Sequence, residues 1–113
     1  MKDCLFCKII SGEIPSSKVY ENDYVYAFKD INPQAPVHVV ICPKEHIDCC
    51  DDINEENSLI ISEIFKAIPV IASDQGLSNG YRIINNCKED GGQSVMHIHF
   101  HLLGGTKLGE KIV

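Results

Sequence analysis

The sequence has no excess of basic residues. Ten Lys and Arg stand against 16 Asp and Glu, so the formal net charge is −6. Because nucleic acids and membrane surfaces are polyanions, this balance argues against a general binder of either. It leaves room for a small phosphate ligand, which backbone N–H groups and one or two side-chain donors can hold.

Long apolar runs, internal repeats and linkers are also absent. The opening MKDCLFCKII has an apolar run that is too short and too soon broken for a signal peptide or a spanning helix. The closing GEKIV carries no lipidation signal, and we expect a cytoplasmic protein. A chain of 113 residues that is 44% hydrophobic suits one domain, 1–113, with its core in 4–105 and a C-terminal tail at 106–113.

Six cysteines are present without any sign of export, which favours free thiols or metal ligands over disulfides. Cys4 and Cys7 form a C-x-x-C pair. Alone this pair only suggests a metal site, because a helical turn that carries two small buried thiols gives the same spacing. The other four show no paired spacing, and we expect them to be small buried hydrophobic residues: Cys42, Cys49, Cys50 and Cys87.

The sequence predicts two helices, a short one within 4–15 and a long one over about 55–74. Acidic residues and asparagines before the long helix offer N-caps. Pro69 should kink or split this helix, and Gly76 is a suitable residue at its C-terminal end. The apolar stripe expected to face the core contains Ile60 or Ile61, Ile64, Ile68 and Ala72.

Five strands are expected from β-branched and alternating segments. They lie in KVYENDYVYAFKDI (two strands with a turn at Asn22–Asp23), VHVVICP, YRIIN and VMHIHFHLL. We therefore predict an α+β fold in which a five-stranded, mostly antiparallel meander packs with one long and one short helix.

Three of the five histidines stand at alternate positions of HIHFHLL, as His97, His99 and His101. On a strand these side chains share one face, about 6.6 Å apart in succession, and the apolar residues between them face the other way. The solvent-facing side of an amphipathic strand would explain one histidine more easily than three in a row. The alternatives are a metal site and an imidazole that acts as a nucleophile or as an acid–base group.

A glycine pair precedes the histidines in DGGQS, residues 90–94. Consecutive glycines let the backbone approach a ligand and point N–H groups at an anion, although such a pair is more often only a turn. Next to three histidines, the pair indicates a phosphate close to an imidazole.

Taken together, GGQSVMHIHFHLLGG, CLFCKIISGEIP, AFKDINPQAPVHVVICPKEHI and GYRIINN resemble the histidine triad family. The resemblance runs from Cys4 to Gly105 and is closest to the nucleoside phosphoramidase branch. The dinucleoside polyphosphate hydrolase branch usually has a Pro-Arg-type ending after the last histidine, where this chain has Gly104–Gly105.

The resemblance implies catalytic roles for four residues. His99 would be the nucleophile that attacks the α-phosphorus and forms a nucleotidyl-imidazole, which water then hydrolyses. His101 would donate to a non-bridging oxygen, together with the backbone of 93–95. Ser94 would lie near the leaving group, although its hydroxyl could equally satisfy the turn. His38 matches a fourth histidine beside the catalytic row; without the family it would be a hydrogen-bonded core histidine.

The resemblance also implies a nucleotide site. Its expected residues are Ile14, Phe28, Asp30, Ile31, Asn86, Gly92, Gln93, Ser94, Val95, His99 and His101. Asp30 would bind the ribose hydroxyls, though an aspartate after a strand is most often a turn or cap residue. Phe28 and Ile31 are more simply core residues, and Asn85 is an alternative to Asn86 at the phosphate.

Many microbial members carry a zinc set that matches Cys4, Cys7, His46 and His97 here, a closed tetrahedral site that would be structural. The resemblance implies no organic cofactor and a homodimer whose two sheets join across the interface. The expected reaction is hydrolysis or transfer on purine nucleoside phosphoramidates or aminoacyl adenylates, with release of an AMP-type nucleoside monophosphate. The alternatives are a dinucleoside polyphosphate hydrolase and a nucleotide-binding regulatory protein with incidental turnover. The tail TKLGEKIV lacks the Trp-Pro-Pro type of ending found in some phosphoramidases.

Overall fold

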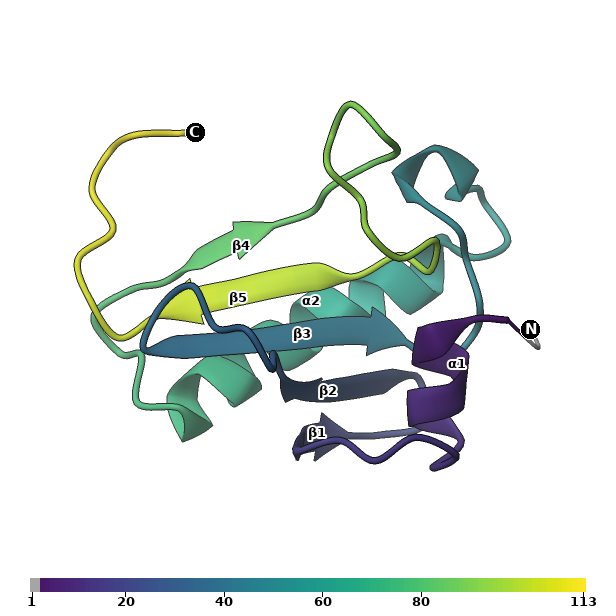
Figure 1. Ribbon diagram of the computed structural model, residues 1–113, viewed down its shortest axis with the longest axis horizontal. Helices are drawn as coiled ribbons and strands as arrows, with labels where there is room; N and C mark the ends of the chain where they lie inside the picture. The colour runs from purple at the N-terminus through teal and green to yellow at the C-terminus, as the bar shows by residue number, and fades with distance from the viewer. Residues whose placement is uncertain (1–2) are drawn as a thin grey trace.

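The computed structural model describes residues 3–113 and contains one five-stranded sheet with two α-helices (Figure 1). The helices are α1 (Leu5–Ile10) and α2 (Ser58–Asp74), and a single 3₁₀ turn, η1 (Cys50–Asp52), precedes α2. The strands are β1 (Lys18–Glu21), β2 (Val25–Lys29), β3 (Val37–Pro43), β4 (Arg82–Ile84) and β5 (Phe100–Gly104). The predicted α+β class is confirmed. Among the described residues, no helix is both long and apolar enough to cross a membrane.

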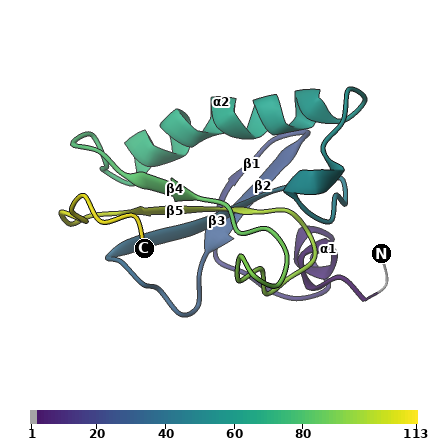
Figure 2. The ribbon, with the colours of Figure 1, turned by 90° about the horizontal axis from the view of Figure 1, so that it is seen from above.

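The strands lie in the order β1-β2-β3-β5-β4, and every neighbouring pair is antiparallel. The expected simple meander is therefore wrong, because β5 lies between β3 and β4. The connection from β3 to β4 runs through α2, which covers one face of the sheet (Figure 2). Because β4 does not pair with β3, the edge of β3 is open to β5, which pairs with it. The expected extension of the sheet across a dimer stays a prediction.

Alternation along the central strands divides the buried residues between the two faces of the sheet. The face under α2 buries, from the strands, Val25, Ala27, Val39, Ile41, Phe100 and Leu102. The opposite face, towards α1, buries Cys4, Phe6, Ile9, Tyr26, Phe28, Val40 and Cys42. Both faces of the sheet are thus covered, and the second, smaller cluster forms the floor of the site described below.

Helix α2 begins at Ser58, three residues later than expected. The residues before it form a local turn instead, in which the side chain of Asn54 accepts hydrogen bonds from the N–H groups of Glu56 and Asn57. The helix ends as expected: Gly76 has φ +76°, and the Leu77 N–H donates to the Ala72 carbonyl over 2.9 Å. This is the αL helix ending that glycine favours.

The predicted core stripe of α2 is confirmed and is wider than expected. Ile64, Ile68 and Ala72 are buried, and Ala67 and Ile71 join them, whereas Ile60 and Ile61 are only partly buried. Pro69 does not split the helix, because it lies on the exposed face. The carbonyl of Phe65, which loses its usual N–H partner to this proline, is on that exposed side, where water can satisfy it.

The last strand is shorter than predicted, since β5 begins at Phe100 and not near residue 95. Continuing the register of Ile41 with Phe100 places Pro43 opposite Ile98. Proline has no N–H to donate to a ladder. The Ile98 N–H donates instead to the Ile47 carbonyl over 2.6 Å, so residues 97–99 are held by segment 43–47 outside the sheet.

Candidate active site

The alternation of the three histidines persists although two of them precede β5. Ile98, Phe100 and Leu102 are buried in the core under α2. The imidazoles lie on the other face, where the ring of Phe6 in α1 is 5.9 Å from the ring of His97 and 4.9 Å from that of His99. The rings of His99 and His101 are 5.1 Å apart. The predicted sharing of one face is therefore confirmed.

The tautomer of His99 follows from its neighbour. Its Nδ1 lies 2.8 Å from the backbone carbonyl oxygen of His97. A carbonyl oxygen only accepts, so Nδ1 carries the proton and Nε2 keeps its lone pair. Burial lowers the pKa of His99 below its ordinary value, and His99 is 4% exposed. At neutral pH this residue is thus a neutral imidazole with a free Nε2, which is the form that a nucleophile requires.

A chain of hydrogen bonds sets the tautomer of His101 in the same way. The backbone N–H of Gln34 donates to Nδ1 of His38 over 3.1 Å, so the proton of neutral His38 is on Nε2. That Nε2 lies 2.9 Å from Nδ1 of His101 and donates to it. His101 therefore carries its own proton on Nε2.

The electrostatics keep His101 neutral. Burial, followed by the charges of His99 and His38, lowers the pKa of His101 to about 4. A neutral His101 with its Nε2 proton is a hydrogen-bond donor beside His99; its predicted role as a donor to phosphate stays a prediction. His38 lies behind His101 and orients it.

Asp30 faces this chain of histidines. Its Oδ2 is 3.4 Å from Nε2 of His38, and its Oδ1 accepts from the Asn32 N–H over 2.8 Å. Both interpretations of Asp30 therefore retain support: the second bond is that of a turn residue, while the carboxylate also borders the cavity described next.

A cavity of about 380 Å³ opens in front of His99 and His101. Eight of the predicted nucleotide-site residues line it: Ile14, Phe28, Asp30, Ile31, Ser94, Val95, His99 and His101. Three others are not among its lining: Asn86, Gly92 and Gln93. Phe28 is buried and serves the core and the cavity at once, whereas Ile31 is 92% exposed and is not a core residue.

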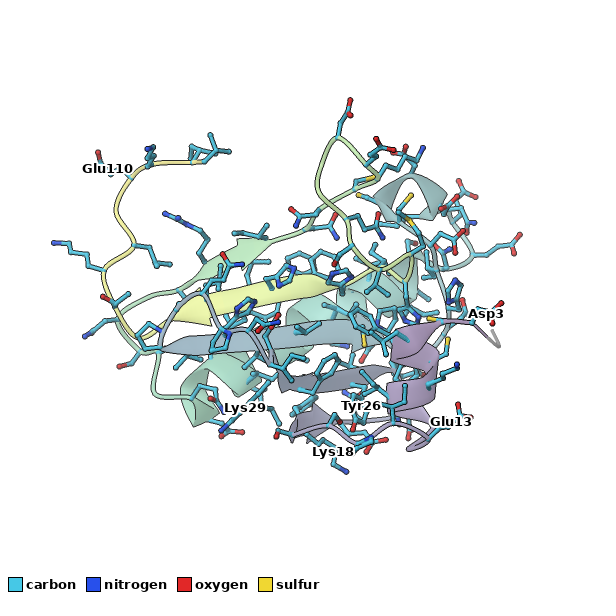
Figure 3. The ribbon with its side chains drawn as sticks, in the orientation of Figure 1. Asp3, Glu13, Lys18, Tyr26, Lys29 and Glu110 are labelled. Carbon is cyan, nitrogen blue, oxygen red and sulfur yellow. The ribbon has the colours of Figure 1, made fainter. Side chains whose placement is uncertain are left out.

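The sequence analysis missed part of the cavity wall. Phe6 and Ile9 of α1 line it, with Val40 of β3. The spacing of Phe6 and Ile9 places them on one face of a short helix, which is a usable signal. Lys29 also lines the cavity, and it is the only Lys or Arg among the lining residues of the described chain; its position is labelled in Figure 3.

The loop before the histidines is held by the side chain of Gln93. Its amide oxygen accepts from the Lys88 N–H over 2.8 Å, and its amide nitrogen donates to the carbonyls of Asp48 and Val95 over 2.7 and 2.9 Å. The backbone N–H of Gln93 donates to the Lys88 carbonyl over 3.0 Å. Of the three predicted backbone donors, those of Ser94 and Val95 make no hydrogen bond within residues 3–113.

The glycines and asparagines of this loop have separate roles. A Cβ on Gly91 would lie 2.4 Å from the Cys87 carbonyl oxygen, so the close turn requires glycine there. Asn85 donates from Nδ2 to the His99 carbonyl over 2.9 Å, which fixes the backbone of His99. Asn86 is half-buried beside it. The choice between the two at a phosphate stays open.

The predicted zinc ligands converge from three segments. Sγ of Cys4 is 3.3 Å from Nδ1 of His97, and Sγ of Cys7 is 3.5 Å from Nδ1 of His46. All four ligand atoms lie within 4.8 Å of one another. Two thiols and two imidazoles match the donor set of structural zinc.

The imidazoles of this set are oriented for metal binding. Nε2 of His97 lies 2.8 Å from the Pro43 carbonyl, and Nε2 of His46 lies 2.6 Å from the Asp48 carboxylate. Both partners accept, so each Nε2 carries a proton and each Nδ1 directs a lone pair at the thiols. Ligating histidines usually have such partners on the second nitrogen. The residues therefore fit zinc.

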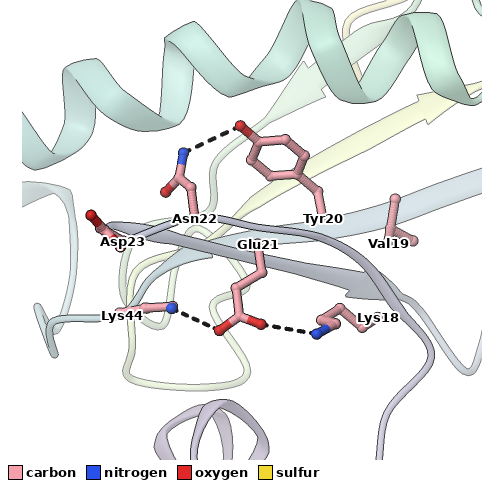
Figure 4. Close-up of a pocket in the computed structure, with 7 residues that line it drawn as sticks. All are labelled: Lys18, Val19, Tyr20, Glu21, Asn22, Asp23 and Lys44. Atoms are coloured by element: carbon pink, nitrogen blue, oxygen red, sulfur yellow. Dashed lines mark hydrogen bonds and ion pairs between the residues drawn. The ribbon is translucent and has the colours of Figure 1, made fainter.

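A second hollow lies at the β1–β2 turn, and it is a poor candidate for a site (Figure 4). Its two lysines are already paired, because the Glu21 carboxylate lies 2.7 Å from Lys44 and 3.0 Å from Lys18. These two ion pairs, Lys44 first, lower the pKa of Glu21. None of the described side chains that line this hollow is both polar and buried, whereas the histidine cavity is lined by the buried His99. The histidine cavity is therefore the candidate active site.

Comparison with known proteins agrees with this geometry. Residues 11–108 match the HIT domain. The chain is 44% identical over 109 residues to the purine nucleoside phosphoramidase of Escherichia coli (strain K12), a match that covers 96% of this chain and 92% of that protein. Cys4 and Cys7 precede the matched domain.

Solved structures give the same result. A HIT family hydrolase from Clostridium thermocellum has a TM-score of 0.97 and 52% identity, covering 100% of this chain and 99% of that one. A histidine triad protein from Clostridium difficile has a TM-score of 0.94 and 50% identity, covering 98% and 97%. These matches take in the sheet, the cavity and all three alternating histidines, and the chain belongs to the HIT domain family.

Proposed function

We propose that the protein is a hydrolase that cleaves the P–N bond of purine nucleoside phosphoramidates, including aminoacyl and alkyl adenylates, and releases the nucleoside monophosphate. The observation that carries the proposal is the pair of fixed tautomers in the cavity: a free Nε2 on His99 and an N–H on His101. The name of the Escherichia coli relative supports the substrate class.

In the proposed first step, Nε2 of His99 attacks the α-phosphorus. The new N–P bond forms as the P–N bond to the leaving amine breaks, and the amine departs with a proton. The hydroxyl of Ser94, which lines the cavity, would relay that proton from solvent water to the leaving nitrogen, and the attacking water of the second step would return a proton to solvent. The imidazole becomes cationic, and the His97 carbonyl stabilises it at Nδ1. In the second step, water breaks the N–P bond and releases the monophosphate and free His99.

Charge stabilisation falls to a small set of donors. The Nε2 proton of His101 and the free N–H groups of Ser94 and Val95 would bind the non-bridging oxygens. The apolar residues from α1 and β2 would hold the base, and Asp30 the ribose. Because Asp30 also lies beside His38, ribose binding would bring its hydroxyls close to the group that orients His101.

Zinc and a second subunit complete the proposal. Cys4, Cys7, His46 and His97 would hold zinc, which would cross-link α1 to the segment before β5. A closed four-ligand site leaves no position for substrate, so this zinc would be structural. A homodimer is supported by β4, which is an edge strand of the sheet, and by exposed apolar residues of α2, Leu59 and Phe65.

The test is a substrate comparison that reads release of nucleoside monophosphate. We expect a higher kcat/KM for an adenosine phosphoramidate than for diadenosine tri- and tetraphosphates, because Lys29 is a single exposed cation at the cavity. Lys107 does not help, since it lines a separate hollow with Gly76 and Gly80. A preference for the dinucleotides would assign the polyphosphate hydrolase reaction instead. Tight nucleotide binding with negligible turnover on every substrate would indicate a regulatory binding protein.

A further inference from the structure

A second group of thiols and carboxylates lies apart from the cavity and from the zinc set. Cys49, Asp51 and Cys87 each offer a ligand atom, and these atoms lie within 4.8 Å of one another. Asp52 adds a fourth group, because the thiol of Cys49 donates to its Oδ2 over 3.3 Å. We propose that these four residues form a second metal site, which takes a thiophilic divalent cation such as Zn²⁺. This proposal is independent of the proposed hydrolase activity.

The donor types and their setting suit such a cation. Two thiolates and carboxylate oxygens are all ligands that zinc accepts, at about 2.3 Å and about 2.0–2.2 Å. The two thiols come from irregular segments: Cys49 is the extended residue before η1, and Cys87 lies in the loop after β4. Closing around an ion therefore requires small shifts of these segments without breaking a strand or a helix.

The surrounding charges favour a cation over a redox thiol pair. A reactive thiol is usually found beside cationic groups, whereas Cys49 faces the carboxylate of Asp52. Carboxylates oppose a thiolate that has no counter-ion, yet they become ligands once a metal is present. Lys88 opposes the metal, because its Nζ lies 2.7 Å from Oδ2 of Asp51. Asp51 can keep that ion pair and offer its other oxygen.

The position gives the site a consequence. Cys87 lies in the loop after β4, and this loop leads to Ser94 at the cavity. Cys49 lies three residues after His46, a predicted zinc ligand. The loop is green and η1 is teal in Figure 1. Gln93 already joins the two segments through the Asp48 carbonyl. A metal held by Cys49 and Cys87 would clamp the loop and stabilise the folded chain, and this stabilisation would grow with the logarithm of the metal concentration above the dissociation constant.

The test is zinc stoichiometry of the reduced, full-length protein, measured by competition with a chromophoric chelator. The wild-type chain should bind one equivalent more than Cys49→Ser or Cys87→Ser. Cys50→Ser is the matched control, because Cys50 is a neighbouring thiol that is exposed and outside the cluster, and it should bind as many equivalents as wild type. Circular dichroism checks that each variant folds. Asp51→Asn, at an exposed position, replaces any variant that does not fold and should weaken the second equivalent about 10-fold or more.

Equal stoichiometry for wild type and Cys87→Ser would overturn the proposal. So would a loss in Cys50→Ser as large as that in Cys87→Ser. The remaining alternative is a disulfide between Cys49 and Cys87, which the intact mass under non-reducing conditions would detect. A mass lower by two hydrogens, with Cys49 and Cys87 in one cross-linked peptide and no bound metal, would show the disulfide and refute the metal site.

Discussion

Replacing Gln93 by Leu tests whether one buried side chain holds the loop beside His99. The side chain is 7% exposed and makes three hydrogen bonds, to the N–H of Lys88 and to the carbonyls of Asp48 and Val95. Leu fills a similar volume with no polar atom. Each lost bond costs about 1 kcal/mol when water can reach the freed partner, so we expect a loss of about 3 kcal/mol. For a domain of this size that lowers Tm by about 10 °C.

Gln93→Glu is the matched control, because it keeps the acceptor for Lys88 and changes only the donor side. Its ionised carboxylate would face two carbonyl oxygens, whereas its protonated form can donate to one of them. The introduced carboxyl should therefore titrate above its ordinary range in the folded state. Such a group contributes stability at low pH that is lost as pH rises. Gln93→Glu should gain stability relative to Gln93→Leu between pH 8 and pH 5.

The assays are urea unfolding and kcat/KM on an adenosine phosphoramidate. Because Ser94 and Val95 follow Gln93 directly, we expect kcat/KM to fall with the stability of the loop. A change of less than about 0.5 kcal/mol in Gln93→Leu, with unchanged kcat/KM, would refute the account of the loop. Equal pH dependence of the Glu and Leu variants would show that the amide donors do not face the two carbonyls.

Three further outcomes follow from the site. His101→Ala should lower kcat/KM about 10²–10³-fold, as loss of one transition-state donor does, while nucleotide binding measured by calorimetry persists; an unchanged rate would remove His101 from the chemistry. Cys4→Ser should lower Tm of the zinc-loaded protein far more than it lowers kcat/KM of the folded fraction, because structural zinc contributes to folding; equal zinc content and Tm would contradict the ligand set. As pH falls, kcat/KM should begin to drop only below pH 6.5, the ordinary pKa of histidine, because burial lowers the pKa of His99 and activity is lost as that group gains a proton. A drop in kcat/KM that begins above pH 6.5 would show that His99 is not held neutral in this way.

Local patterns predicted what depends on nearby residues. The alternation of His97, His99 and His101 with apolar residues gave the two faces of the segment, and the stripe of α2 gave its buried side. The convergence of Cys4 and Cys7 with two distant histidines came from the family resemblance, and the distances bear it out. Spacing alone could not have chosen His46 and His97.

What the sequence could not give depends on partners far along the chain. The place of β5 between β3 and β4 is a tertiary choice that no local period encodes. The β3–β5 pairing stops at Phe100 because the register places Pro43 opposite Ile98, and this register cannot be read from the sequence. The tautomers depend on the backbone groups of Gln34 and His97, which no side-chain pattern reveals.

The nearness of Cys49 to Cys87 likewise had no spacing signal. Gln93 was expected at the nucleotide because of its motif. Its buried side chain instead binds three backbone groups, which only the folded loop brings together.

The central claim is that Nε2 of His99 forms a bond to phosphorus during turnover. The most direct measurement is rapid acid-free quenching during hydrolysis of an adenosine phosphoramidate, followed by peptide mass spectrometry. The account predicts a nucleotidyl group on the peptide that contains His99, absent in His99→Ala, which should bind nucleotide without turnover. Turnover by His99→Ala at the wild-type rate, or a nucleotidyl group on His97 or His101 in its place, would contradict it.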